Sequence, residues 1–154
     1  PMALRDSISN NTKTAMKSGD KIRVSTLRLI SAAIKDRDIA ARAEDRCEGI
    51  ADTEILSLLQ KMVRQREESA KTYEDNGRPE LAERELSEIG IIREFMPKPL
   101  SDAEMRLAVN DAVKANNATC LKDMGKVMGS LKTLYAGRLN MGKAGALVKE
   151  HLCN

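Results

Sequence analysis

Lysines and glycines are concentrated in the segment from Leu121 to Lys149, in a pattern that suits phosphate binding. The segment holds five lysines and one arginine against a single acid, Asp123. At about 100° per residue, a helix would place Lys122, Lys126 and Lys132 opposite an apolar face. That face is formed by Met124, Val127, Met128, Leu131 and Leu134. The polar side of the helix therefore carries a concentrated positive charge.

Two glycines, Gly125 and Gly129, lie one helical turn apart among these lysines. A glycine inside a helix costs roughly 0.5–1 kcal/mol relative to alanine, so the pair indicates a reason other than stability. A notch in a basic surface would let a phosphate backbone approach closely. Small residues at this spacing also mark close helix crossings, so the notch would equally suit a neighbouring helix.

A second basic surface is expected near the N-terminus. Lys21, Arg28 and Lys35 recur every seven residues and would form a ridge roughly 20 Å long on one helix. Residues 13–37 carry a net charge of +5, residues 44–94 carry −6, and residues 121–149 carry +5. The ridge could contact phosphates, or it could be an ordinary solvated helix face.

The chain offers little for catalysis. Its only histidine, His151, lies near the C-terminus, so neither a histidine-based metal site nor a Ser-His triad is expected. No GxxxxGK[ST] phosphate loop is present. We therefore expect no catalytic residues, no metal and no cofactor.

Composition limits the class of protein. Aromatic residues make up 2% of the chain and tryptophan is absent, which argues against base stacking and leaves phosphates as the expected contacts. No apolar run approaches the length of a membrane span. Three widely spaced cysteines, Cys47, Cys120 and Cys153, favour reduced thiols over disulfides. A cytoplasmic protein without membrane contact is expected.

Helices must position these residues, and the sequence predicts an all-α fold in two domains. Residues 2–96 form an N-terminal helical domain, 97–100 a proline-containing linker, and 101–154 a C-terminal domain. Four N-terminal helices are expected, at about 3–17, 21–43, 52–76 and 79–96. Asp20 is the expected N-cap of the second, and the third and fourth should form an antiparallel hairpin. Residues expected to face inward include Ile22, Ile30, Ala33 and Ile34 in the second helix and Leu81, Ile89, Ile92 and Phe95 in the fourth.

One charged residue falls on an apolar face of the expected hairpin. Arg66 lies in line with Ile55, Leu59 and Met62. A charge in such a position needs a partner. Folding the chain about Gly77 brings Glu85 within about one helical turn of it, so Arg66 and Glu85 are expected to form a structural pair.

The C-terminal domain begins with a complete helix-start signal. Ser101 is the expected N-cap and Glu104 completes a capping box. This helix should end near Asn116-Asn117, and the glycine-notched helix follows. After a turn at residues 136–138, a last helix runs from about Met141 to Leu152. The three helices predict a small bundle with a lysine-rich surface.

The sequence resembles the YqeY family of small bacterial proteins over nearly its whole length. The resemblance rests on KSGDKIRVSTLRLISAAIKDRDIAAR, on the LAERELSEI and PKPLS region, and on KDMGKVMGSLKTLYAGR. The family is similar to the helical and C-terminal tail region of the B subunit of the glutamyl-tRNA(Gln)/aspartyl-tRNA(Asn) amidotransferase. Where that family continues Gly-Arg-Ala-Asp, this chain has Gly137-Arg138-Leu139-Asn140, and Asn140 can cap the last helix in place of the acid.

The resemblance implies a tRNA-binding or amidotransferase-associated accessory protein. Its motif marks a surface expected to meet the RNA, which comprises Lys122, Gly125, Lys126, Gly129, Lys132, Gly137, Arg138 and Lys143. Expected partners are tRNA, contacted through its backbone, or amidotransferase and synthetase proteins, without DNA specificity. Carbon-nitrogen ligase activity with glutamine as amide donor would be inherited from the enzyme only by family association. The alternative is a helical protein-protein adaptor that docks a partner on the notch.

Overall fold

The computed structural model describes residues 3–153, with Cys153 described by its backbone alone, and these residues form seven α-helices and one short 3-10 helix. The expected all-α class is confirmed. The chain separates into two compact units between Met96 and Pro97. Met2 and Asn154, the outer limits of the two expected domains, and the Cys153 thiol lie outside what the structure describes.

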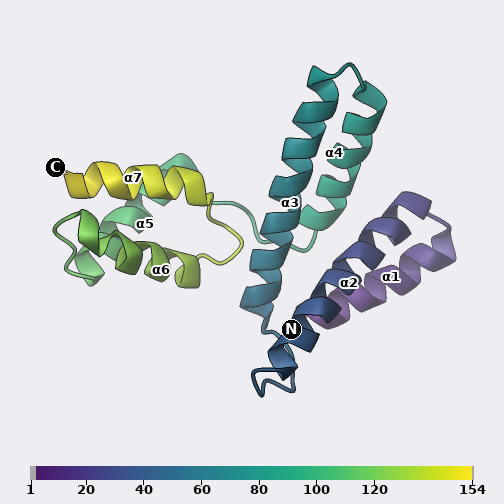
Figure 1. The fold of residues 1–154 in the computed structure, drawn as a ribbon, viewed down its shortest axis with the longest axis horizontal. Coiled ribbons are helices and arrows are strands. Elements are labelled where there is room, and N and C mark those ends of the chain that lie inside the picture. Colours follow the sequence, from purple (N-terminus) through teal and green to yellow (C-terminus); the bar gives the residue numbers. More distant parts are fainter. Residues whose placement is uncertain (1–2, 154) are drawn as a thin grey trace. The chain divides into compact units, whose positions relative to one another are not determined.

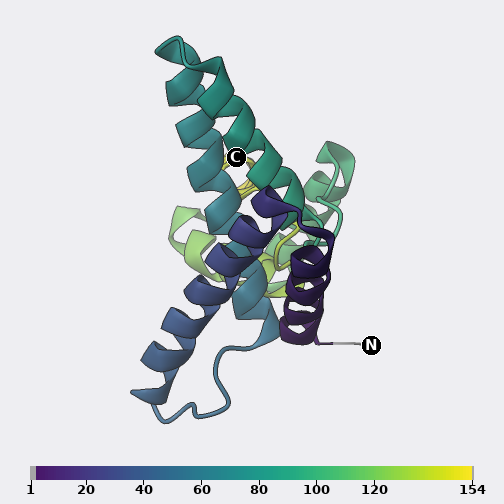
Figure 2. The same ribbon diagram turned by 90° about the vertical axis from the view of Figure 1, so that its right-hand side faces the viewer.

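The first unit consists of two antiparallel helical hairpins (Figure 1). Helix α1 spans Leu4–Ser18 and α2 spans Lys21–Arg42, and Gly19 between them has a φ of +76° that ends α1 in the left-handed conformation. Asp20 caps α2 by accepting a hydrogen bond from the Arg23 N–H, as expected. Helix α3 spans Asp52–Asp75 and α4 spans Pro79–Arg93. The loop that connects α2 to α3 can be followed in Figure 2.

The core of the first unit joins all four helices. Ile8, Leu27, Ile55 and Ile92 are each at most 2% exposed. Towards its far end the α3–α4 hairpin packs through smaller residues, with Ala70 and Ala82 buried.

Three residues expected inside are exposed. Ile22 is 42% exposed, Leu81 38% and Leu134 70%. Each lies in the first or last turn of its helix, where neighbouring helices cover less of the surface. For Ile22, the buried position one turn further along is taken by Thr26, which is 0% exposed.

Arg66 forms its ion pair with Glu88, a correction to the expected pairing with Glu85. Its Nε lies 3.4 Å from Glu88 Oε2, and both side chains are at most 15% exposed. One turn of register separates the two candidate acids, which is within the error of counting residues around the hairpin. Glu85 lies nearby, and the pKa of its carboxyl group is raised. Burial is the main cause, the negative charge of Glu88 raises the pKa further, and the positive charge of Arg66 acts in the opposite direction.

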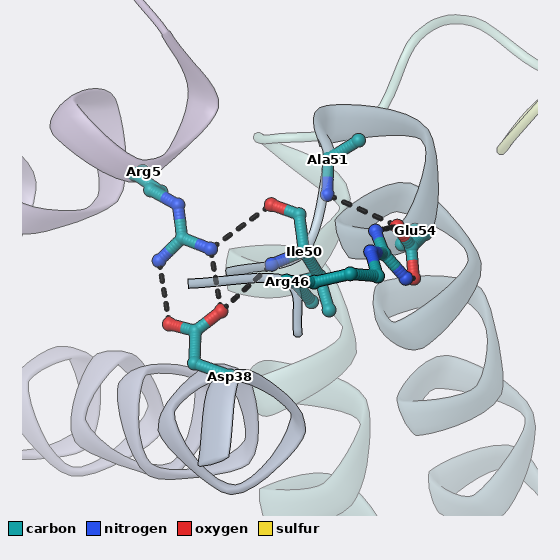
Figure 3. Close-up of polar contacts among 6 residues, drawn as sticks. All are labelled: Arg5, Asp38, Arg46, Ile50, Ala51 and Glu54. Carbon is teal, nitrogen blue, oxygen red and sulfur yellow. Dashed lines mark hydrogen bonds and ion pairs between the residues drawn. The ribbon is translucent and has the colours of Figure 1, made fainter. Parts of the chain in front are cut away.

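A cluster of arginines and carboxylates, which we call the latch, holds the α2–α3 loop (Figure 3). The Arg5 guanidinium donates to both oxygens of Asp38, at 2.7 and 2.6 Å, and to the Ile50 carbonyl at 3.0 Å. The Ile50 N–H donates to Asp38 at 2.9 Å. Nearby, Arg46 pairs with Glu54. The start of α1, the end of α2 and the loop are thereby joined.

The second unit is a three-helix bundle. Helix α5 spans Asp102–Ala115, the 3-10 helix η1 spans Leu121–Asp123, α6 spans Met124–Leu134 and α7 spans Met141–Cys153. The predicted capping box is confirmed, because Ser101 Oγ accepts from the Glu104 N–H and Glu104 accepts from the Ser101 N–H. The core contains Met105, Val109, Val127, Leu131 and Val148.

Candidate nucleic-acid-binding surface

Burial fixes which side of α6 faces outward. Val127 and Leu131 are 0% exposed and pack into the core of the bundle. At about 100° per residue, Gly125 and Gly129 lie on the opposite side of the helix. Both glycines are exposed. The inward apolar residues thus present the glycine side of α6 to solvent.

The notch formed by Gly125 and Gly129 is open. A Cβ added at either glycine would meet no atom within 4 Å among the residues compared. No helix of the second unit is therefore seated against these glycines, and close packing within the bundle does not account for them. The second unit itself therefore leaves the notch open.

Lysines flank the notch. At about 100° per residue, Lys126 lies on one side of the two glycines and Lys132 on the other. Both side chains are exposed. Lys122 is also exposed but lies in η1, so it precedes the α-helix and is not part of its regular face. The notch consequently presents accessible backbone between two positive charges.

Asp123, the single acid of this segment, is held by the chain that precedes η1. Its carboxylate accepts a hydrogen bond from the Thr119 N–H at 3.0 Å. This bond is the main reason that the pKa of Asp123 is lowered, and the charge of Lys126 contributes less. In the sequence Asp123 stands out only as the single negative charge among the lysines, and no local pattern predicts its bond to the preceding chain.

Gly137 and Arg138 have structural roles in the turn between α6 and α7. Gly137 has a φ of +75°, which favours glycine. Arg138 Nε donates to the Lys98 carbonyl at 2.9 Å, and the Arg138 carbonyl accepts from the Leu100 N–H at 2.9 Å. Arg138 therefore fastens the proline-containing segment to the bundle, a role that its place in a basic motif did not reveal.

Lys143 begins the last helix. Its N–H donates to Asn140 Oδ1 at 3.1 Å, which confirms Asn140 as the N-cap of α7. Its ammonium lies 3.8 Å from Asp102 Oδ1, with both side chains more than half exposed. An exposed pair at this distance contributes little, so Lys143 keeps most of its capacity to meet an external anion.

The second basic surface lies on α2. Lys21, Arg28 and Lys35 are all exposed. They belong to the first unit, whereas the notch belongs to the second. The structure thus brings Gly125, Lys126, Gly129 and Lys132 together on one helix of the second unit, whereas the ridge lies on a helix of the first.

No group of three or more His, Cys, Asp or Glu side chains among the described residues could hold a metal ion. None of the described helices combines the length and apolarity needed to cross a membrane.

The fold and this surface define a class, an all-helical protein of two compact units in which one exposes a lysine-flanked glycine notch. The chain belongs to the YqeY family: it matches the family described as Yqey-like protein over residues 5–152. The family resemblance found in the sequence is confirmed.

Similar proteins include yeast proteins called altered inheritance of mitochondria protein 41, mitochondrial. The one from Lachancea thermotolerans is 30% identical over 130 residues, covering 79% of this chain and 67% of that protein. The one from Clavispora lusitaniae is 31% identical, covering 75% and 68%. The one from Saccharomyces cerevisiae strain YJM789 is 23% identical, covering 80% and 68%. The similarity therefore extends to eukaryotic proteins, beyond the bacterial proteins that the resemblance named.

Proposed function

We propose that this protein binds tRNA through the phosphate backbone, using the notched side of α6, and acts as an accessory to tRNA-linked amide transfer. The observation that carries the proposal is the open notch, with exposed backbone at Gly125 and Gly129 and with Lys126 and Lys132 on either side. The missing side chains at the two glycines would let a phosphate backbone approach the helix closely, and the neighbouring ammonium groups suit phosphate contacts, which position a protein on RNA without reading its sequence.

The proposal assigns binding and includes no catalytic step. The family's similarity to the amidotransferase B subunit supports tRNA, or an amidotransferase or synthetase, as the partner. The exposed Cys47 and half-buried Cys120 are free thiols, which supports a reducing compartment, and we propose the cytoplasm.

The test measures binding of total tRNA across a salt series, with double-stranded DNA as competitor. The variant Lys126→Ala/Lys132→Ala should bind more weakly and lower the slope of log K against log salt by about 2, because each lysine on a phosphate contributes about 1. The control Lys61→Ala/Lys71→Ala removes the same charge from exposed positions on α3 and should leave the slope unchanged. Arg138 is kept, because its loss would release Lys98.

Two results would refute RNA binding at the notch. One is no measurable binding at low salt, and the other is equal loss in the test and control variants. Equal competition by DNA would show polyanion binding without the proposed RNA preference.

A protein-protein adaptor is the second candidate, favoured by the open glycine pair itself, because small residues one helical turn apart also suit a close helix crossing. Gly129→Leu should abolish capture of a synthetase or amidotransferase subunit with weak salt dependence if the notch docks a helix. The matched control is Gly90→Leu on α4, where the glycine is also open. Retained capture by Gly129→Leu would exclude the notch as that docking site.

A further inference from the structure

Helices α1 and α2 enclose a groove on the first unit, with a volume of about 350 Å³. Its floor includes the buried side chains of Ile8 and Ile34. Two lysines and two serine hydroxyls also line it, namely Lys13, Lys35, Ser9 and Ser31. The groove therefore combines a closed apolar floor with ammonium and hydroxyl donors.

The only carboxylate that lines this groove is already occupied. Asp38 accepts from both terminal nitrogens of Arg5 and from the Ile50 N–H, as Figure 3 shows. The Arg5 hydrogen bonds are the main reason that the pKa of Asp38 falls to about 2. Asp38 and Arg5 thus neutralise each other at any physiological pH. The two lysines remain as the net charge of the groove.

Lys13 and Lys35 are uncompensated in the described structure. Six ion pairs are found among the residues that the structure places, and neither lysine takes part in any of them. Both side chains are exposed. By contrast, Arg23 is paired with Glu94 and Arg5 with Asp38. The fold neutralises these two arginines and leaves the lysines of the groove available.

The groove is continuous with the basic ridge. Lys35 lines the groove and is also the last member of the series Lys21, Arg28 and Lys35 along α2. Fourteen residues of helix extend the surface by roughly 20 Å. A chain of phosphates entering the groove could therefore follow the ridge, whereas a single small anion would use only part of the surface.

We propose that the α1–α2 groove and its adjoining ridge are a second site for phosphate groups of an RNA backbone, separate from the notch on α6. This inference rests on the proposed RNA-binding function and extends it to the first unit. Lysine ammonium groups would contact the phosphate oxygens, and the serine hydroxyls would donate to phosphate or ribose oxygens. Contacts of this kind require no particular base sequence.

The test uses the full chain, total tRNA and a salt series, with three variants of equal charge change. Lys13→Ala/Lys35→Ala removes the groove lysines, Lys126→Ala/Lys132→Ala removes those of the notch, and Lys61→Ala/Lys71→Ala is the control. The groove variant should lower the slope of log K against log salt by about 2 relative to the control. Lys13→Arg/Lys35→Arg should retain the wild-type slope, because a cation remains at each position.

The outcomes separate the two proposals. If the notch variant alone loses slope, the groove proposal is overturned and the proposed function stands. If the groove variant alone loses slope, the groove proposal stands and the notch is excluded as the RNA surface. If both variants lower the slope, both proposals are supported. If tRNA binding by both variants is indistinguishable from that of the control, or if the wild type does not bind tRNA, both proposals are overturned. If the groove variant leaves tRNA binding unchanged but weakens the binding of a polyglutamate peptide, the groove is assigned to an acidic protein and the proposal is overturned.

Discussion

Replacing Asp38 with asparagine should destabilise the first unit by about 2 kcal/mol at neutral pH. The pKa of Asp38 is lowered from its usual 3.8 to about 2, mainly by hydrogen bonds from Arg5. Each pH unit corresponds to about 1.4 kcal/mol, so a drop of this size is worth roughly 2.5 kcal/mol. The Asp38 side chain is 20% exposed, so solvent screens it only partly. Asparagine keeps some hydrogen bonding, which reduces the expected loss slightly.

The pH dependence has a definite sign. Because the pKa is lower in the folded protein than in the unfolded chain, the stabilisation is complete above about pH 4. It is lost as the pH falls from 3.8 towards 2. The difference in unfolding free energy between wild type and Asp38→Asn should therefore shrink over this window and approach zero only below it.

Native-state amide hydrogen exchange measures the effect in the first unit separately from the second. Protected amides of Leu27 and Ile55 report on its core, where both side chains are 0% exposed. Asp36→Asn is the matched control, since Asp36 is exposed and lies two residues from Asp38 on the same helix. A loss below about 0.5 kcal/mol at pH 7, or equal losses in both variants, would refute the reasoning about the latch.

Three further changes test other parts of the structure. Gly49 has a φ of +85°, and an added Cβ would lie 2.8 Å from Arg5 Nη2. Gly49→Ala should therefore lower the free energy of unfolding in urea by at least about 2 kcal/mol, because a left-handed alanine is strained and would crowd the latch. Gly19→Ala, at a φ of +76° with open space, should cost less, and equal costs would show that crowding is unimportant. Gly125→Ala/Gly129→Ala should raise unfolding stability by roughly 1–2 kcal/mol while weakening tRNA binding, whereas Gly90→Ala should stabilise α4 without affecting binding; stabilisation with unchanged binding would contradict the role of the notch. Ser101→Ala should cost about 1 kcal/mol and speed exchange of the Glu104 amide, and unchanged exchange would contradict the capping geometry.

Local signals in the sequence predicted the helices well. Gly19, Asp20 and Ser101 mark helix ends through preferences that act within a few residues, and each lies at the expected boundary. The glycine notch could also be placed, because the apolar period of α6 leaves one orientation for Gly125 and Gly129.

Side-chain pairing between distant segments could not be predicted in the same way. The latch joins Arg5 to Asp38, 33 residues away, and no local pattern specifies that meeting. Glu85 and Glu88 lie about one helical turn apart on α4. Identifying Glu88 as the partner of Arg66 would have required the register of the hairpin to be known to better than one turn. The involvement of Arg138 with Lys98 likewise depends on tertiary structure, although its basic surroundings suggested a ligand contact.

The latch also bears on how long the first unit stays folded. The hydrogen bonds that Arg5 makes in the latch span 33 and 45 residues, whereas each helical hairpin is formed by neighbouring segments. Contacts between distant residues carry a larger loop-closure cost and tend to form after local ones. Interactions absent from the folding transition state act mainly on the unfolding rate. The pair of Arg5 and Asp38 is therefore expected to set the lifetime of the native first unit, while the speed at which its helices assemble depends on the hairpins.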